Sequence, residues 1–218
     1  MDTVRRHLIV QAANVHSGGG RALLAALLAA WPDDLSGVVQ VDKRMPLQGL
    51  ASHRLQFRAI APTLLQRLKA EWWLRQNVGQ TDLVLCFGNL PPLFRVQGQV
   101  VLFLQNRYLV DQVSLKGFPW KTRLRLELER RWFAWRIGNV QTVLVQTPSM
   151  QSLLASSGVL RTQSVRVLPF LSTSQGYLRV CSAANVKPPA TRFVYVASGE
   201  PHKNHRRLVQ AWILLAQE

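Results

Sequence analysis

Three consecutive glycines near the N-terminus are the first residues whose type and spacing suggest chemistry. Gly18, Gly19 and Gly20 follow a short apolar run, and an Ala- and Leu-rich segment, 21–31, comes directly after them. Consecutive glycines let a backbone approach a ligand closely, and the N-terminus of a following helix presents free N–H groups. A phosphate or a carboxylate fits such a turn. A tight turn without a ligand is the alternative, because neither Gly-x-Gly-x-x-Gly nor Gly-Lys-Ser/Thr is present.

His16 stands just before these glycines and is a candidate for positioning the hydroxyl group of an acceptor. A purely structural histidine is the alternative. The two cysteines, Cys86 and Cys181, are far apart and have no metal-ligand spacing around them. Cys86 lies in an apolar run, which favours a small buried side chain. The sequence therefore predicts no metal site, and it defines no catalytic residue.

The elements that must position these residues alternate along the chain. Apolar strands are expected at 7–13, 35–41, 81–87, 99–104, 140–146 and 164–168, with helices at 21–31, 63–77, 120–137 and 148–156. Near-continuous apolar strands between helices favour a parallel sheet covered on both faces. The fold class predicted is α/β, Rossmann-like.

A change of composition divides the chain into parts. Residues 1–171 are expected to form the first domain, and 172–191, which gather Ser, Gly, Asn and Pro, a linker. A strand at 192–197 and a helix at 205–217 follow. Because one strand and one helix cannot bury a core alone, we expect 192–218 to be the beginning of a second Rossmann-like domain.

The stretch 193–212 resembles the start of the C-terminal domain of GT-B glycosyltransferases of family 4 (glycosyltransferase group 1). The match consists of Pro201, Lys203, Asn204, Leu208 and Ala211. The resemblance implies that Lys203 binds the diphosphate of a nucleotide-sugar donor. It further implies that Gly18, Gly19 and Gly20 face that donor from the first domain. The likeness covers most of the chain in architecture but only two short motifs in residues.

Three departures accompany the resemblance. Many relatives carry an Arg shortly before the Lys, where this chain has Ser198, Gly199 and Glu200. Many place a His after a middle strand of the first domain, where this chain has Asn106, which becomes a candidate acceptor-binding residue. The family's Glu-x7-Glu pair is not reached before Glu218, so we expect this chain to be incomplete and inactive alone.

By resemblance the protein is an enzyme, a hexosyltransferase type of glycosyltransferase that takes a sugar from a nucleotide-sugar. Retention of anomeric configuration, no cofactor, no metal and a lipid-linked or polysaccharide acceptor are expected. The expected location is cytoplasmic, peripheral on the inner membrane face.

The charge of the chain raises rival interpretations. Lys and Arg total 27 and Asp and Glu 11, which gives a net charge of +16 and favours anionic partners. A basic nucleic-acid-binding protein is one alternative, although no recognition motif for nucleic acid is present. A non-catalytic interaction protein with an α/β fold is another.

Two predicted helices combine basic and aromatic residues in a way that allows two interpretations. The residues are Trp72, Trp73, Arg75, Trp120, Lys121, Arg123, Arg125, Arg130, Arg131, Trp132, Trp135 and Arg136. Trp beside Arg or Lys suits an anionic membrane surface. Alternatively, Leu124, Leu128, Trp132 and Trp135 share helical spacing and form a core face. On 63–77 the apolar side is expected to comprise Leu64, Leu65, Leu68 and Trp72, with Trp73 as a further candidate.

Overall fold

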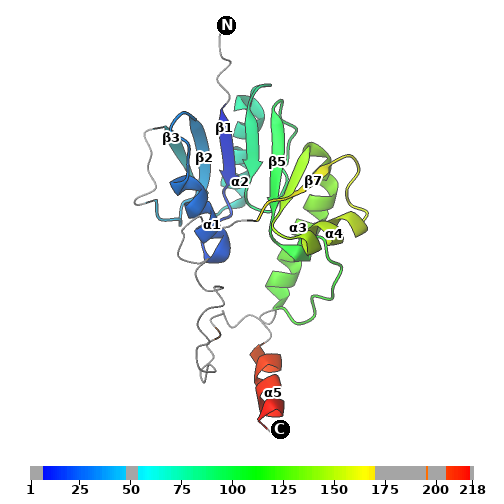
Figure 1. The fold of residues 1–218 in the computed structure, drawn as a ribbon. Helices are drawn as coiled ribbons and strands as arrows, with labels where there is room; N and C mark the ends of the chain where they lie inside the picture. Colours follow the sequence, from blue (N-terminus) through cyan, green and yellow to red (C-terminus); the bar gives the residue numbers. More distant parts are fainter. Residues whose placement is uncertain (1–6, 48–53, 170–194, 196–204, 217–218) are drawn as a thin grey trace, which may run out of the picture. The chain divides into compact units, whose positions relative to one another are not determined.

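The computed structural model describes residues 7–47, 54–169, 195 and 205–216 (Figure 1). The chain divides into two compact units, Met1–Val113 with Leu124–Phe170, and Ser114–Arg123 with Leu171–Glu218. The first unit contains a sheet and the helices that pack on it. Its strands are β1 (Leu8–Ala12), β2 (Gly37–Asp42), β3 (Leu55–Ile60), β4 (Leu83–Cys86), β5 (Gln99–Leu104), β6 (Thr142–Val145) and β7 (Ser164–Val167). The helices are α1 (Gly18–Ala29), α2 (Leu64–Asn77), α3 (Trp120–Arg136), whose first turn belongs to the second unit, and α4 (Pro148–Ser156), with short turns η1 (Arg107–Leu109) and η2 (Ile137–Asn139).

The described strands form one seven-stranded sheet in the order β3-β2-β1-β4-β5-β6-β7, and every neighbouring pair is parallel. Ile9 in β1 is in register with Val38 of β2 on one side and Val84 of β4 on the other. The strand order therefore reverses between β1 and β4. In open sheets of this kind ligands bind beyond the carboxyl ends of the strands at such a reversal.

Successive strand residues supply the two faces of the sheet. Ile9 and Val84 belong to a core that includes Leu74 of α2, Phe133 of α3 and Leu154 of α4. The opposite core joins Val10, Ala12 and Val39 of the strands to Leu24 and Leu28 of α1. Helices thus cover both faces, and the predicted α/β class with a Rossmann-like parallel sheet is confirmed.

One strand and one helix boundary differ from the sequence prediction. β3 was not expected, because only Leu55 and Ile60 are buried in it and the polar Gln56 and Arg58 hide the strand signal at the edge of the sheet. The helix α1 begins at Gly18 rather than at residue 21. The three glycines are therefore the first turn of a helix and not a separate turn before it.

The prediction that the apolar side of α2 faces the core was wrong for most of its residues. The helix buries Ala70, Glu71 and Leu74, all on the side that packs against the sheet. Four of the apolar residues expected there are exposed: Leu64 84%, Leu65 62%, Leu68 48% and Trp72 47%. The further candidate, Trp73, is half-buried and packs against the core. Helical spacing recognises an apolar stripe, but it does not decide which stripe meets the sheet.

The interpretation of α3 as a helix with a Trp-rich core face was also wrong. Leu126 and Phe133 are its buried residues, and Ile137 continues the same stripe in η2. Leu124, Leu128 and Trp135 lie on the opposite side and are each more than half exposed, while Trp132 is half-buried. Three of the four residues that share helical spacing therefore form a surface stripe, and Trp132 lies at its inner border.

The described part of the second unit contains α5 (His205–Leu215), which agrees with the helix predicted at 205–217. The Tyr195 ring meets the His205 ring edge-on at 5.2 Å between centroids. The predicted strand 192–197, apart from Tyr195, and the linker 172–191 lie outside the described residues, as do Lys203 and Cys181.

Candidate functional site

The carboxyl ends of β1 and β4 approach each other closely at the reversal of strand order. Asn14, which follows β1, donates from Nδ2 to the carbonyl oxygen of Gly88, which follows β4, at 2.7 Å. A Cβ at Gly88 would overlap the Asn14 side chain. Glycine at this position therefore lets the segments after β1 and β4 pack directly against each other at this edge of the sheet.

The first turn of α1 lies at the same edge of the sheet. Gly18 has a φ of 62°, in the left-handed region that glycine adopts without strain. Gly18 and Gly19 are exposed, and a Cβ at either would meet no described atom within 4 Å. Ser17 occupies the cap position, but its side chain makes no capping hydrogen bond within the described structure. The first N–H groups of α1 thus remain available to an anion.

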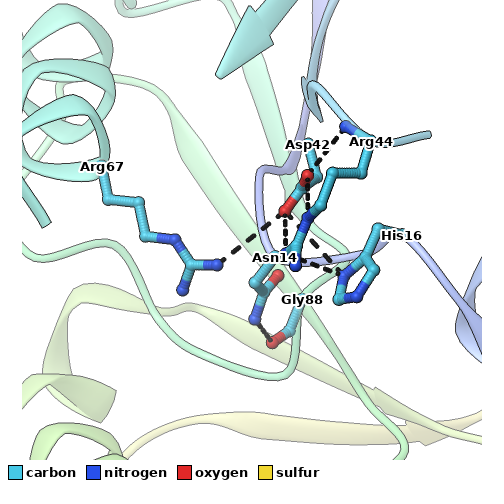
Figure 2. Close-up of polar contacts among 6 residues, drawn as sticks. All are labelled: Asn14, His16, Asp42, Arg44, Arg67 and Gly88. Carbon is cyan, nitrogen blue, oxygen red and sulfur yellow. Dashed lines mark hydrogen bonds and ion pairs between the residues drawn. The ribbon is translucent and has the colours of Figure 1, made fainter. Parts of the chain in front are cut away.

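A charged cluster surrounds Asp42 at the end of β2 (Figure 2). Asp42 is fully buried, and Arg44 binds it through Nε to Oδ1 at 2.9 Å and Nη2 to Oδ2 at 2.7 Å. His16 Nδ1 lies 3.9 Å from Oδ2, and Arg67 Nη2 of α2 lies 4.0 Å from the same oxygen. The hydrogen bonds from Arg44 lower the pKa of Asp42. One carboxylate is thus shared by the guanidinium groups of Arg44 and Arg67, which leaves excess positive charge beside His16.

A second buried carboxyl, Glu71, lies beside a small hollow with a mostly apolar lining. Its Oε2 accepts from the Leu93 amide at 2.7 Å and its Oε1 accepts from the Gln11 side chain. Burial raises the pKa of Glu71 to about 7. The hollow encloses about 50 Å³ and is lined by Gln11, Ala13, Asn14, Arg67, Ala70, Glu71, Gly88, Leu90 and Trp132. Room for a water or a hydroxyl group therefore lies next to a carboxyl that titrates near neutrality.

A larger hollow, of about 420 Å³, lies at the carboxyl ends of β5 and β6. It is lined by Leu104, Gln105, Arg107, Gln146, Thr147, Ser149, Met150 and Leu153. Thr147 caps α4 by accepting from the Met150 amide. Arg107 supplies a cation at the rim and pairs with Asp111. Hydroxyl groups beside a guanidinium suit a polar or anionic ligand.

Asn106 stands beside this larger hollow and has a structural task. Its Oδ1 accepts from the Tyr108 amide at 3.1 Å and starts the short turn η1. Asn89, with a φ of 68°, binds the amides of Gln105 and Asn106 through its Oδ1 at 2.6 and 2.9 Å. The Asn89 side chain thus holds the ends of β4 and β5 together, whereas the Asn106 side chain stabilises only the turn after β5.

The structure places the predicted site residues of the first unit along one edge of the sheet. His16, after β1, joins the Asp42 cluster shortly before the glycines, whereas Asn106 lies two strands further along the sheet, after β5. Their predicted ligands remain predictions. Lys203 falls outside the described residues.

Sequence reasoning missed Asp42, Arg44, Arg67 and Glu71. A signal existed for Asp42, because an acidic residue ending the second strand is a recurrent ligand-binding position in Rossmann-like folds. Glu71 gave no such signal, since its burial depends on which side of α2 meets the sheet.

Metal ligands do not cluster in the described part of the chain: no group of three or more His, Cys, Asp or Glu could hold an ion there. Burial raises the pKa of the Cys86 thiol, as expected for a small core residue. Among the described helices, none is both long and apolar enough to cross a membrane.

Comparison with known proteins gives one structural likeness to report. No protein-family model matches the sequence, and no curated protein matches it. A solved structure of a UGT transferase from Siraitia grosvenorii, in complex with UDP, aligns with a TM-score of 0.36 at 14% identity. The alignment covers 79% of this chain and 53% of the other, so this chain spans about half the length of that protein.

Proposed function

We propose that this chain is part of a nucleotide-sugar-dependent glycosyltransferase of the GT-B kind. In this proposal the first turn of α1 binds the diphosphate of the donor, together with Lys203. The acceptor is lipid-linked or a polysaccharide, and the sugar is transferred with retention of configuration. No cofactor and no metal take part.

The observation that supports this proposal best is the uncapped, glycine-only start of α1 beside the reversal of strand order. The positive end of the α1 dipole, with the amides of Gly18, Gly19 and Gly20, lies at the carboxyl edge of the sheet. Excess charge from Arg44 and Arg67 adds to this field. A leaving diphosphate is stabilised by such preorganised donors and cations, which act without forming a covalent bond.

Saturation-transfer NMR with UDP-, GDP- and ADP-sugars tests the proposal. Binding of one nucleotide-sugar is expected, and Lys203→Ala is expected to weaken it. Failure of the folded protein to bind any of them would contradict the proposal. A preference for one DNA sequence that persists at high salt, without any response to nucleotide-sugars, would favour the nucleic-acid alternative.

Substitution Gly19→Ala separates the role of the glycines in binding from their role in folding. An added Cβ meets no described atom within 4 Å, so the fold is expected to lose nothing and to gain up to about 1 kcal/mol of helix propensity. The same methyl group would obstruct a phosphate at the helix start, so donor affinity is expected to fall about tenfold. Gly138→Ala, at an equally open glycine beyond the opposite edge of the sheet, is the matched control.

A further inference from the structure

The exposed side of α2 is apolar where a surface helix is ordinarily polar. Leu64, Leu65, Leu68 and Trp72 all lie on it, and Arg75 follows one turn later on the same side. The sole acidic residue of the helix, Glu71, is buried against the sheet. The exposed residues of α2 are thus apolar, cationic or uncharged polar (Gln66, Gln76 and Asn77), and none of them is acidic.

The helix α3 repeats this arrangement over the part that belongs to the first unit. Leu124, Leu128 and Trp135 form an exposed stripe, and Arg131 lies within it. The acids Glu127 and Glu129 are engaged by cations of the same helix, Arg130 at 3.6 Å and Arg125 at 3.7 Å. The excess charge of this stripe is therefore also positive.

The two helices are neighbours on one face of the sheet. Both contribute to the same core, through Leu74 and Phe133, and both line the small hollow that contains Arg67 and Trp132. Burial raises the pKa of Glu129 in α3, and the charges of Arg125 and of Arg67 in α2 oppose this rise, which places Arg67 near α3. The exposed stripes therefore lie on adjacent helices of one face of the sheet. We call these stripes the Leu/Trp surface: Leu64, Leu65, Leu68, Trp72, Leu124, Leu128 and Trp135.

Guanidinium groups hold the tryptophan rings of the Leu/Trp surface. Arg136 stacks over the Trp135 ring at 3.4 Å from its centroid, and Arg75 lies 5.2 Å from the centroid of Trp72. Trp72 also meets Phe94 edge-on at 5.6 Å. Rings held in place beside cations suit the headgroup level of a bilayer, where the ring is half immersed and the cation meets phosphate.

We propose that the Leu/Trp surface docks the protein on the surface of an anionic lipid bilayer, with α2 and α3 lying in the interface. Amphipathic helices bind in this way when their apolar face enters about 5–10 Å into the headgroup region and their cations meet acidic lipids. Arg75, Arg131 and Lys69 supply these cations. This inference does not depend on the proposed transferase activity.

Charge decides between a bilayer and a second copy of the chain. A symmetric dimer through the Leu/Trp surface would bring Arg75 and Arg131 of one copy toward the same cationic patch on the other. Like charges placed together at an interface oppose association. Acidic headgroups offer the complementary charge, and the whole chain, at +16, is attracted to them.

Co-sedimentation of the full chain with vesicles is the test. Vesicles of phosphatidylcholine and phosphatidylglycerol in equal parts are expected to bind the protein, and vesicles of phosphatidylcholine alone much less. The quadruple variant Leu65→Gln, Leu68→Gln, Leu128→Gln and Trp135→Gln is expected to lose about tenfold or more in partition coefficient. Each substituted side chain is about half or more exposed, so the variant should fold, which circular dichroism checks.

A charge variant and matched controls complete the experiment. Arg75→Gln with Arg131→Gln is expected to reduce binding about fivefold for each cation. Leu168→Gln and Arg161→Gln remove exposed residues near β7 and should leave binding unchanged. Three results would overturn the proposal: no binding by the folded chain, equal binding by the quadruple variant, or self-association in sedimentation velocity that the quadruple variant abolishes.

Discussion

At the scale of single residues, Glu71 is the group whose ionisation should control stability near neutral pH. The carboxyl is buried, and its pKa is raised from 4.5 to about 7. The folded state therefore binds the proton more tightly than the unfolded state. Stability is fully present below pH 4.5 and is lost as the pH rises to about 7. The loss is on the order of 3 kcal/mol at most.

Substitution Glu71→Gln should remove this pH dependence. The amide keeps an oxygen for the Leu93 N–H, and Gln11 can turn its own amide to match. The variant is expected to be as stable as the unaltered protein near pH 5 and more stable near pH 8, measured by denaturant unfolding.

Glu127→Gln is the control for this prediction. The Glu127 side chain is 48% exposed and pairs with Arg130, so its loss should change stability by less than about 0.5 kcal/mol at either pH. An identical fall of stability with pH in the Glu71→Gln variant would assign the titration to another group.

At the scale of elements, α2 shows that the contribution of an apolar residue to stability depends on which side of the helix it occupies. Leu74 is fully buried in the core beneath the sheet, whereas Leu68, on another side of the helix, is 48% exposed. Leu74→Ala is expected to lower the free energy of unfolding by about 2–5 kcal/mol. Leu68→Ala should change it by less than about 0.5 kcal/mol.

Urea denaturation of the two alanine variants, side by side, measures this difference. Each substitution removes the same atoms from the same helix, so helix propensity cancels between them. Equal losses of stability would mean that the described exposure of Leu68 is wrong, and with it the orientation of α2.

At the scale of the whole molecule, the net charge of +16 predicts binding to any polyanion at low ionic strength. Duplex DNA should bind without preference between sequences. Affinity is expected to fall about a thousandfold between roughly 50 and 200 mM salt, because counterion release drives such binding. Fluorescence anisotropy with two unrelated duplexes measures it. A preference for one duplex that persists at high salt would instead indicate specific recognition.

Prediction from sequence succeeded for the frame of the candidate site and failed for its charges. The strand ends and the start of α1 were accessible, because apolar runs and glycines act locally. The cluster of Asp42, Arg44, Arg67 and His16 was not, since its members come from separate segments. Their meeting depends on β2 lying beside β1 and on how α2 packs.

The sequence by itself determined the alternation of strands and helices, the α/β class and the position of the glycines after the first strand. Those features follow from periodicity and backbone freedom over a few residues. Only the tertiary structure decided which side of α2 and α3 is buried, and it placed Glu71 inside and Trp135 outside. A helix with two apolar stripes can pack by either one. The choice depends on contacts with strands distant in sequence, which local patterns do not contain.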